Sequence, residues 1–143
     1  MGPTLGTNLT QSIYSAKNIA AAAAGANTVT VTFSPAAAYP DIRIVEYSGA
    51  DPNNPVDVTA GSSGNSATTS SGSAVTTNPT DLLFGANIVW TTTTGAGSGF
   101  TQRLITPDGD IAEDEMVKAT GSYSASASLN QSGPWVMQMV AFR

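Results

Sequence analysis

Hydrophobic and polar residues alternate with a period of two along several stretches of the chain, a pattern that predicts β-strands. The clearest case is residues 27–33, where two valines and a phenylalanine would face inward between outward-facing threonines. Residues 9–19 have the same period, so we expect another strand there. The alanine run at residues 20–24 is too short to form a helix by itself and is interpreted as a connector.

A denser apolar segment, residues 40–51, predicts the strand on which the other strands pack. Its Val, Ile and Tyr residues favour a half-buried, pleated surface. Pro40 suits a strand entrance, and Gly49 followed by Asp51 and Pro52 supplies the stop. We therefore expect a central strand here.

Residues 51–78 are rich in Ser, Thr, Gly and Asn, which predicts a long surface loop with one short strand at residues 73–77. Residues 1–8 are interpreted as an N-terminal extension. The apolar alternation returns after the loop, and the last of the remaining strands is expected to be central. These strands are predicted at residues 81–90, 100–106, 111–120, 122–129 and 134–143.

About eight short strands separated by turn residues predict an all-β fold, an antiparallel β-sandwich with jelly-roll-like connections. At 143 residues the chain is expected to be a single domain, residues 1–143, that can bury a real core. No segment approaches the roughly 18 apolar residues of a membrane-spanning helix. No export signal follows Met1, so we expect a mature form or a piece of a longer protein.

The amino-acid composition excludes several kinds of partner and catalytic site. Charged residues make up only 10% of the chain, and the net charge is −5 with five scattered basic residues. A nucleic-acid partner is therefore not expected, because it would require clustered Lys or Arg. The chain has no His and no Cys, which excludes disulfides, thiol catalysis and nearly all zinc sites. A serine nucleophile would have no histidine base, and we predict no enzymatic activity.

Five segments together resemble a known class of module. In chain order they are similar to β-sandwich modules of large secreted bacterial surface proteins. The resemblance implies an extracellular or cell-surface location and an adhesive, carbohydrate-facing or spacer role, without any catalytic residue. It also implies that the chain covers the later part of such a domain and lacks the N-terminal strands. The segments are residues 26–33, 42–51, 109–117, 121–129 and 135–143.

Half of the acidic residues lie between positions 107 and 115, and two interpretations are open. Hard oxygen ligands this close together suit Ca²⁺, with Asp108, Asp110, Glu113 and Asp114 as candidate ligands. The spacing is not that of an EF-hand loop. The alternative is a solvated turn followed by a strand with outward-facing acidic residues.

Glu46 falls in phase with the isoleucines of the predicted central strand. If that face is buried, the carboxyl group needs a partner or a proton, whereas on an outward face it would form a surface ion pair. A buried acid could also promote an intramolecular Lys–Asn isopeptide bond, as in some bacterial surface sandwiches. The candidate members are Lys17 or Lys118, the acid Glu46, and Asn130 or Asn87.

Most aromatic residues lie in predicted strands and are assigned to the core. Tyr39 and Trp90 lie beside loops instead, and loops on a rigid scaffold often carry binding residues. These two rings are therefore the candidate ligand-binding residues, because they could stack on sugar rings. They support one functional hypothesis, a carbohydrate-binding, adhesin-like or lectin-like module, for which both calcium-dependent and calcium-independent binding are open.

The preferred hypothesis is a non-enzymatic extracellular structural module that assembles with itself. A sandwich without its first strands would leave open edges and an uncovered apolar face, both of which invite association. Strand donation from residues 9–19 would fill the gap in a neighbour and could build a fibre, unless a separate chain supplies the missing strands. The face proposed for this assembly strand consists of Leu9, Ile13, Lys17 and Ile19.

Overall fold

A computed structural model describes residues 1–143 and contains β-strands but no helix, which confirms the all-β, antiparallel prediction. It has no helix able to cross a membrane. There are ten strands where about eight are predicted, and the jelly-roll connections stay a prediction. The strands are β1 (Thr4–Gly6), β2 (Leu9–Gln11), β3 (Val56–Ser70), β4 (Ala74–Val75), β5 (Asp81–Val89), β6 (Thr93–Ala96), β7 (Thr101–Ile105), β8 (Ile111–Val117), β9 (Ser122–Tyr123) and β10 (Ser126–Phe142).

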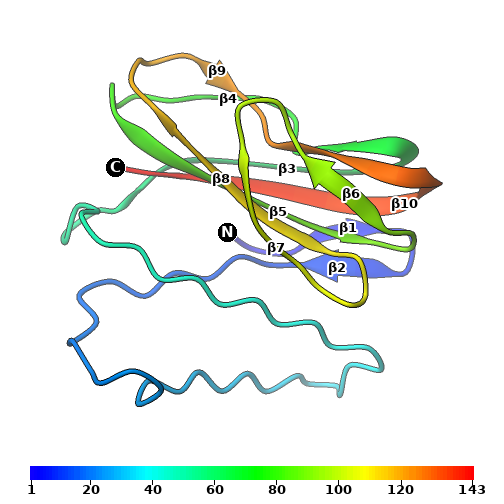
Figure 1. The fold of residues 1–143 in the computed structure, drawn as a ribbon, viewed down its shortest axis with the longest axis horizontal. Coiled ribbons are helices and arrows are strands. Elements are labelled where there is room, and N and C mark those ends of the chain that lie inside the picture. Colours follow the sequence, from blue (N-terminus) through cyan, green and yellow to red (C-terminus); the bar gives the residue numbers. More distant parts are fainter.

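The main sheet has six strands, in the order β3-β10-β5-β8-β7, with β6 beside the first part of β10 (Figure 1). Two small sheets, β1-β2 and β4-β9, complete the fold. Strand β10 is the organising element because it pairs with β3, β5 and β6. The prediction that the last strand is central agrees with this pairing, whereas the prediction that residues 40–51 form the central strand is wrong.

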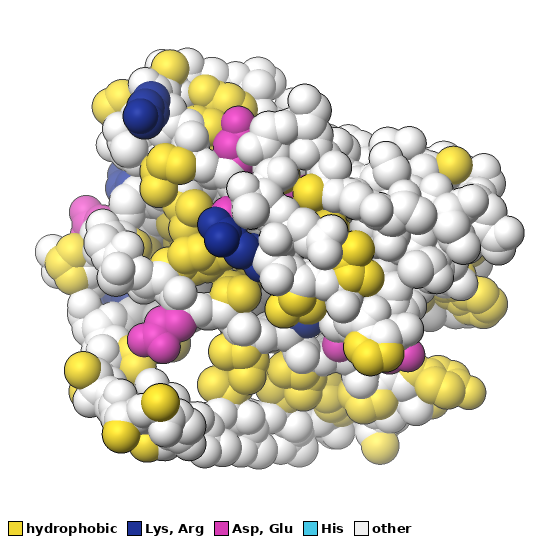
Figure 2. All heavy atoms as spheres, viewed as in Figure 1, with side chains coloured by type: hydrophobic (Ala, Val, Ile, Leu, Met, Phe, Trp, Pro, Cys, Tyr) yellow, Lys and Arg dark blue, Asp and Glu magenta, His cyan; other side chains and the backbone are white.

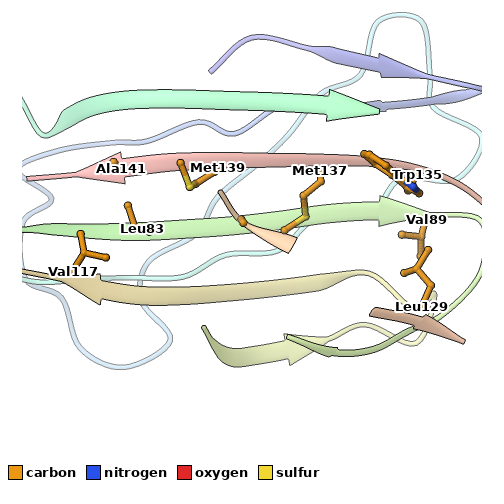
Figure 3. Packing of buried hydrophobic residues seen from close by; sticks show 9 residues of the cluster. Leu83, Val89, Val117, Leu129, Trp135, Met137, Met139 and Ala141 are labelled. Atoms are coloured by element: carbon orange, nitrogen blue, oxygen red, sulfur yellow. The ribbon is translucent and has the colours of Figure 1, made fainter. Parts of the chain in front are cut away.

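The main sheet is covered on both faces. On one face, alternate residues of β10 and β5 form the larger core, in which Met137 and Met139 are fully buried (Figure 3). Full burial of each such side chain contributes about 1.5–3 kcal/mol. On the opposite face a smaller cluster of Phe84, Ala86 and Ala112 packs against residues from the N-terminal third of the chain.

The predicted loop at residues 51–78 instead contains β3, a 15-residue strand antiparallel to β10. Its Gly, Ser and Thr residues resemble a loop in composition, but their small size lets this strand lie close under the large side chains of β10. The short strand expected at residues 73–77 corresponds to β4. Residues 1–8, predicted as an extension, contribute the β1 hairpin strand that lies over the main sheet.

Residues 12–55, which we call the arm, contain no strand. Residues 27–50 make no backbone–backbone hydrogen bond at all. The strands predicted at residues 27–33 and 40–51 are therefore wrong, and the strand predicted at residues 9–19 ends at Gln11. In Figure 1 the arm forms two long legs beneath the main sheet, the first leg before and the second leg after the bends at residues 34–39. A period of two favours extended backbone, but it does not provide the neighbouring strand that completes a sheet.

Candidate functional site

A groove of about 520 Å³ lies between the arm and the end of the main sheet. Four segments build its walls: the turn between β1 and β2, residues 33–41 of the arm, the end of β5, and the turn between β7 and β8. Tyr39, Trp90, Asp108 and Asp110 all line it. The sequence pointed to these residues as two separate candidate sites, and the structure brings them together.

The two aromatic residues of the groove are exposed to solvent. Tyr39 is 94% exposed and Trp90 is 59% exposed. Trp90 directly follows β5, and its backbone N–H donates to the carbonyl of Pro134 at 3.1 Å, which holds the backbone of Trp90 at the end of the sheet. The other tryptophan, Trp135, is buried and donates its indole N–H to Ser66 Oγ at 2.9 Å. Only Trp90 is therefore available to a ligand.

Asp110 forms a rigid acidic floor for the groove. It is only 2% exposed, and its Oδ1 accepts a hydrogen bond from the backbone N–H of Val89 at 2.8 Å. Its own N–H donates to Thr106 Oγ1 at 3.2 Å, and the N–H of Thr106 donates back to the Asp110 carbonyl at 2.9 Å. Gly109 closes this turn in the left-handed region, with φ of 95°, which glycine adopts without strain.

The arm contributes a second carboxyl group beside Asp110. Burial, and after it the hydrogen bond with Asp41, raise the pKa of Asp110 to about 7. Asp41 Oδ2 also accepts a hydrogen bond from Thr106 Oγ1 at 3.3 Å and lies 3.7 Å from Arg43 Nε. Around neutral pH Asp110 is therefore only about half ionised, and the Arg43 guanidinium group provides a positive charge beside the pair.

Arg43 ties the arm to the sheet. Its Nη1 donates to the backbone carbonyls of Asn87 and Ile111, the second at 2.8 Å. Sequence reasoning missed this role because it considered only the face of Ile42, Ile44 and Glu46 and left open whether that face is buried. The alternation itself was read correctly, but the face that contacts the sheet is the other one, with Arg43 on it. The charged pair Asp41 and Arg43 could have indicated this role, because these two residues interrupt one face of an otherwise apolar segment.

The structure does not bring the four candidate calcium ligands into one site. Successive residues of a strand point to opposite faces, so Glu113 and Asp114 of β8 are separated by the sheet. Glu113 accepts from the N–H of Gly97 at 2.9 Å, while Asp114 is held by Arg103 and by the hydroxyl of Tyr47. No cluster of three carboxyl groups could hold an ion. Calcium binding stays a prediction, with Asp108 and Asp110 as the candidate ligands that share the groove.

The residues considered for an isopeptide bond also contact different parts of the chain. Lys17 donates to the carbonyl of Asn53, and Asn130 Oδ1 accepts from the N–H of Thr92 at 3.1 Å. Glu46 is exposed, so it lacks the burial that an acid promoting this bond requires. The geometry brings none of the three together.

The four residues of the proposed assembly strand also lie in different surroundings. Leu9 belongs to β2, and Ile13 packs against the cluster around Phe84. The side chain of the neighbouring Gln11 donates to the carbonyl of Ala86 at 2.8 Å, so this segment is engaged with its own sheet. Ile19 is exposed instead and lines a hollow within the arm.

That hollow, of about 300 Å³, lies between the two legs of the arm, with Val29 from one leg and Ile44 from the other. These two side chains are 58% and 59% exposed. In Figure 2, hydrophobic side chains line the opening between the lower layer and the body of the molecule. The arm thus presents apolar side chains and unpaired backbone at one surface.

Comparisons of the chain with family models, curated proteins and solved structures found no match. The resemblance to bacterial surface modules remains a prediction, and the proposals below depend on geometry alone.

Proposed function

We propose that this protein is a non-enzymatic, extracellular structural module that associates with further copies of itself through the arm. One observation supports the proposal above all others. Residues 27–50 form two legs joined by bends, make no backbone–backbone hydrogen bond, and leave Val29, Val31, Ile42 and Ile44 exposed.

Unpaired backbone and exposed apolar side chains favour association for separate reasons. Extended backbone with free N–H and C=O groups is a template for pairing with another strand. Burying a valine or isoleucine side chain completely contributes about 1.5–3 kcal/mol, so four such side chains offset much of the cost of ordering an interface.

The chain also contains surfaces that could receive such a segment. Strand β3 pairs only with β10, and strand β7 pairs only with β8, so the main sheet has two open edges. A second copy supplies both the donor segment and the acceptor edge, which makes it a better match than an unrelated chain. A closed two-fold arrangement would give a dimer, and a head-to-tail arrangement would give a fibre.

Charge does not oppose this association. The arm has two basic residues, Lys17 and Arg43, and three acidic residues, Asp41, Glu46 and Asp51, so its net charge is −1. The whole chain has a net charge of −5. Repulsion between two arms is therefore small, and Arg43 and Asp41 are already paired within each copy.

Residues 27–50 replace residues 9–19 as the donor in this proposal, because Gln11 and Ile13 are held by their own sheet. The function is otherwise the one expected from the sequence. A separate chain that supplies a strand is the competing interpretation, and it predicts a monomer in the absence of that chain.

Light scattering after size separation tests the proposal. The wild-type protein should be dimeric or larger at high micromolar concentration and should dissociate on dilution. The double variant Val31→Thr, Ile44→Thr should shift the protein to monomer, since it removes apolar contact but keeps the extended backbone. Thr30→Ser, in the same leg, is the matched control and should leave the size unchanged. A folded wild-type monomer at every concentration would rule out self-association.

A further inference from the structure

We infer that the groove between the arm and the end of the main sheet binds an uncharged oligosaccharide. The inference does not depend on self-association. It is drawn from the size of the groove, its exposed rings, its fixed polar groups and its charge.

The groove has the dimensions and lining of a small-molecule site. Its volume of about 520 Å³ falls in the range of roughly 300–1,000 Å³ that ligand sites occupy. Phe33, Pro40 and Ile88 give it an apolar wall, and a few polar residues are set among them. This mixture is typical of sites that bury a ligand and also orient it.

The two rings are suited to the C–H face of a sugar. Tyr39 and Trp90 remain largely exposed although each offers a large apolar surface, and no aromatic partner stacks on either ring. Both rings also carry a polar tip that can hydrogen-bond to a hydroxyl group. Rings from two separate segments could contact two successive sugar units, which favours an oligosaccharide over a monosaccharide.

The polar residues match hydroxyl groups. A sugar hydroxyl both donates and accepts, and the groove offers an acceptor in the exposed Asp108 and mixed donor–acceptor groups in Asn8 and Thr10. Asp110 is buried and bonded to Val89 and Thr106, so it holds the turn that carries Asp108 in place before a ligand arrives. Pre-positioned acceptors of this kind give orientation specificity.

The charge of the groove selects among ligands. Three aspartates and no lysine or arginine line it, so an acidic sugar would be repelled. A cation is also a poor match, because Asp41 and Asp110 share a hydrogen bond and Arg43 compensates them. Asp108 alone is left without a compensating charge; a single exposed carboxyl group repels anions and can accept hydrogen bonds from the hydroxyl groups of an uncharged ligand.

Tryptophan fluorescence can test the inference, since Trp90 is exposed and Trp135 is buried. The probes are cellopentaose, maltopentaose, xylopentaose, mannopentaose and chitopentaose, with trigalacturonate as the acidic probe and choline as the cationic probe. At least one neutral pentasaccharide should give a saturable blue shift. Tyr39→Ala and Trp90→Ala should each weaken binding about tenfold. Binding to the Tyr39→Ala variant is measured by Trp90 emission, and binding to the Trp90→Ala variant is measured by calorimetry.

Tyr14→Ala is the matched control, because Tyr14 is an equally exposed tyrosine of the arm that does not line the groove. It should bind like the wild type. Near-ultraviolet circular dichroism checks that every variant is folded. The inference is overturned if no neutral probe saturates, if trigalacturonate or choline binds more tightly, or if both ring variants bind as well as the control.

The titrations are repeated with calcium and with a chelator. Unchanged affinity in chelator supports direct contact between the Asp108 carboxyl group and the sugar. A strict requirement for calcium would overturn that direct contact and assign Asp108 and Asp110 to the ion.

Discussion

Gly64 of β3 lies directly under the indole ring of Trp135, its register partner in β10. A Cβ atom added at Gly64 would lie 2.5 Å from Cζ2 of that ring. The ring cannot easily move away, because its N–H is bonded to Ser66 of the same strand. This contact makes β3 a packed element of the sheet despite its loop-like composition.

Gly64→Ala should therefore lower the free energy of unfolding by about 1–3 kcal/mol, the usual cost of overpacking a well-filled site. Chemical denaturation followed by Trp fluorescence measures it. Gly95→Ala is the matched control, since a Cβ at Gly95 of β6 meets open space, and its effect should stay within about 0.5 kcal/mol. Equal effects in the two variants would show that the indole contact is unimportant.

The buried carboxyl group of Glu113 should make the free energy of unfolding depend on pH. The residue is fully buried on the larger core face, and one carboxyl oxygen has no hydrogen-bond partner. Burial raises its pKa to about 7. Because the folded pKa lies above the unfolded one, this contribution to stability is complete below about pH 4.5 and is lost as the pH rises through about 7.

Glu113→Gln should remove that loss and raise the free energy of unfolding at pH 8 by up to about 3 kcal/mol relative to wild type. Urea denaturation at pH 5 and pH 8 measures the effect. Glu46→Gln, which changes an exposed residue, serves as the control and should follow the wild type. A Glu113→Gln variant with the wild-type pH slope would contradict the assignment.

Tyr47 attaches the second leg of the arm to the sheet. Its hydroxyl donates to Asp114 Oδ2 at 2.6 Å, and its ring meets Phe84 edge-on at a centroid distance of 6.3 Å. Burial alone would raise the pKa of Asp114, but hydrogen bonds from Arg103 and Tyr47 lower it overall. The hydroxyl of Tyr47 therefore bonds to an ionised acceptor, which makes a comparatively strong contact.

Tyr47→Phe keeps the ring contact and removes this bond. We expect a loss of about 1–2 kcal/mol, felt mainly in how firmly the arm is held. Trypsin cleavage after Arg43, which is protected while its side chain lies against the sheet, should become faster. Tyr14→Phe, at an exposed tyrosine, should leave the cleavage rate unchanged. An unaltered rate in Tyr47→Phe would mean that the ring alone holds the arm.

The fold class was predictable because it depends on local alternation, and the central position of the last strand was predictable from its nearly continuous apolar run. Residues 135–141 are all buried, so both faces of this strand are covered, as such a run predicts. Strand pairing is not local. Residues 27–33 alternate more cleanly than β3 does, yet β3 is paired and they are not, because pairing depends on what lies beside a segment.

The candidate site was predictable residue by residue but not as a unit. Tyr39, Trp90, Asp108 and Asp110 were each recognisable, because a ring beside a loop and an acidic turn are local signals. Their convergence depends on how the arm lies against the end of β5, which no local pattern encodes. Asp41 and Arg43 were missed for the same reason, since their role is defined by the carbonyls and carboxyl group across the groove.

The contact between Asp41 and Asp110 predicts that the arm loosens in alkaline solution. The only other charged groups beside it are Arg43 of the arm and the exposed Asp108 of the turn. The raised pKa of Asp110, about 7, means that its contribution to stability is present at acidic pH and is lost as the pH rises through about 7. Above that pH Asp110 is ionised beside the carboxyl group of Asp41, and the two sides of the groove repel each other.

Trp90 lies in this groove and reports the change. Between pH 5 and pH 9 its emission should shift to longer wavelength with a midpoint near 7 as the groove opens, while the buried Trp135 contributes a constant background. Asp110→Asn should abolish the transition, because an amide keeps a hydrogen bond to Asp41 without acquiring charge. Asp108→Asn, at an exposed position of the same turn, should keep it. A transition that persists in Asp110→Asn would assign the pH response to another group.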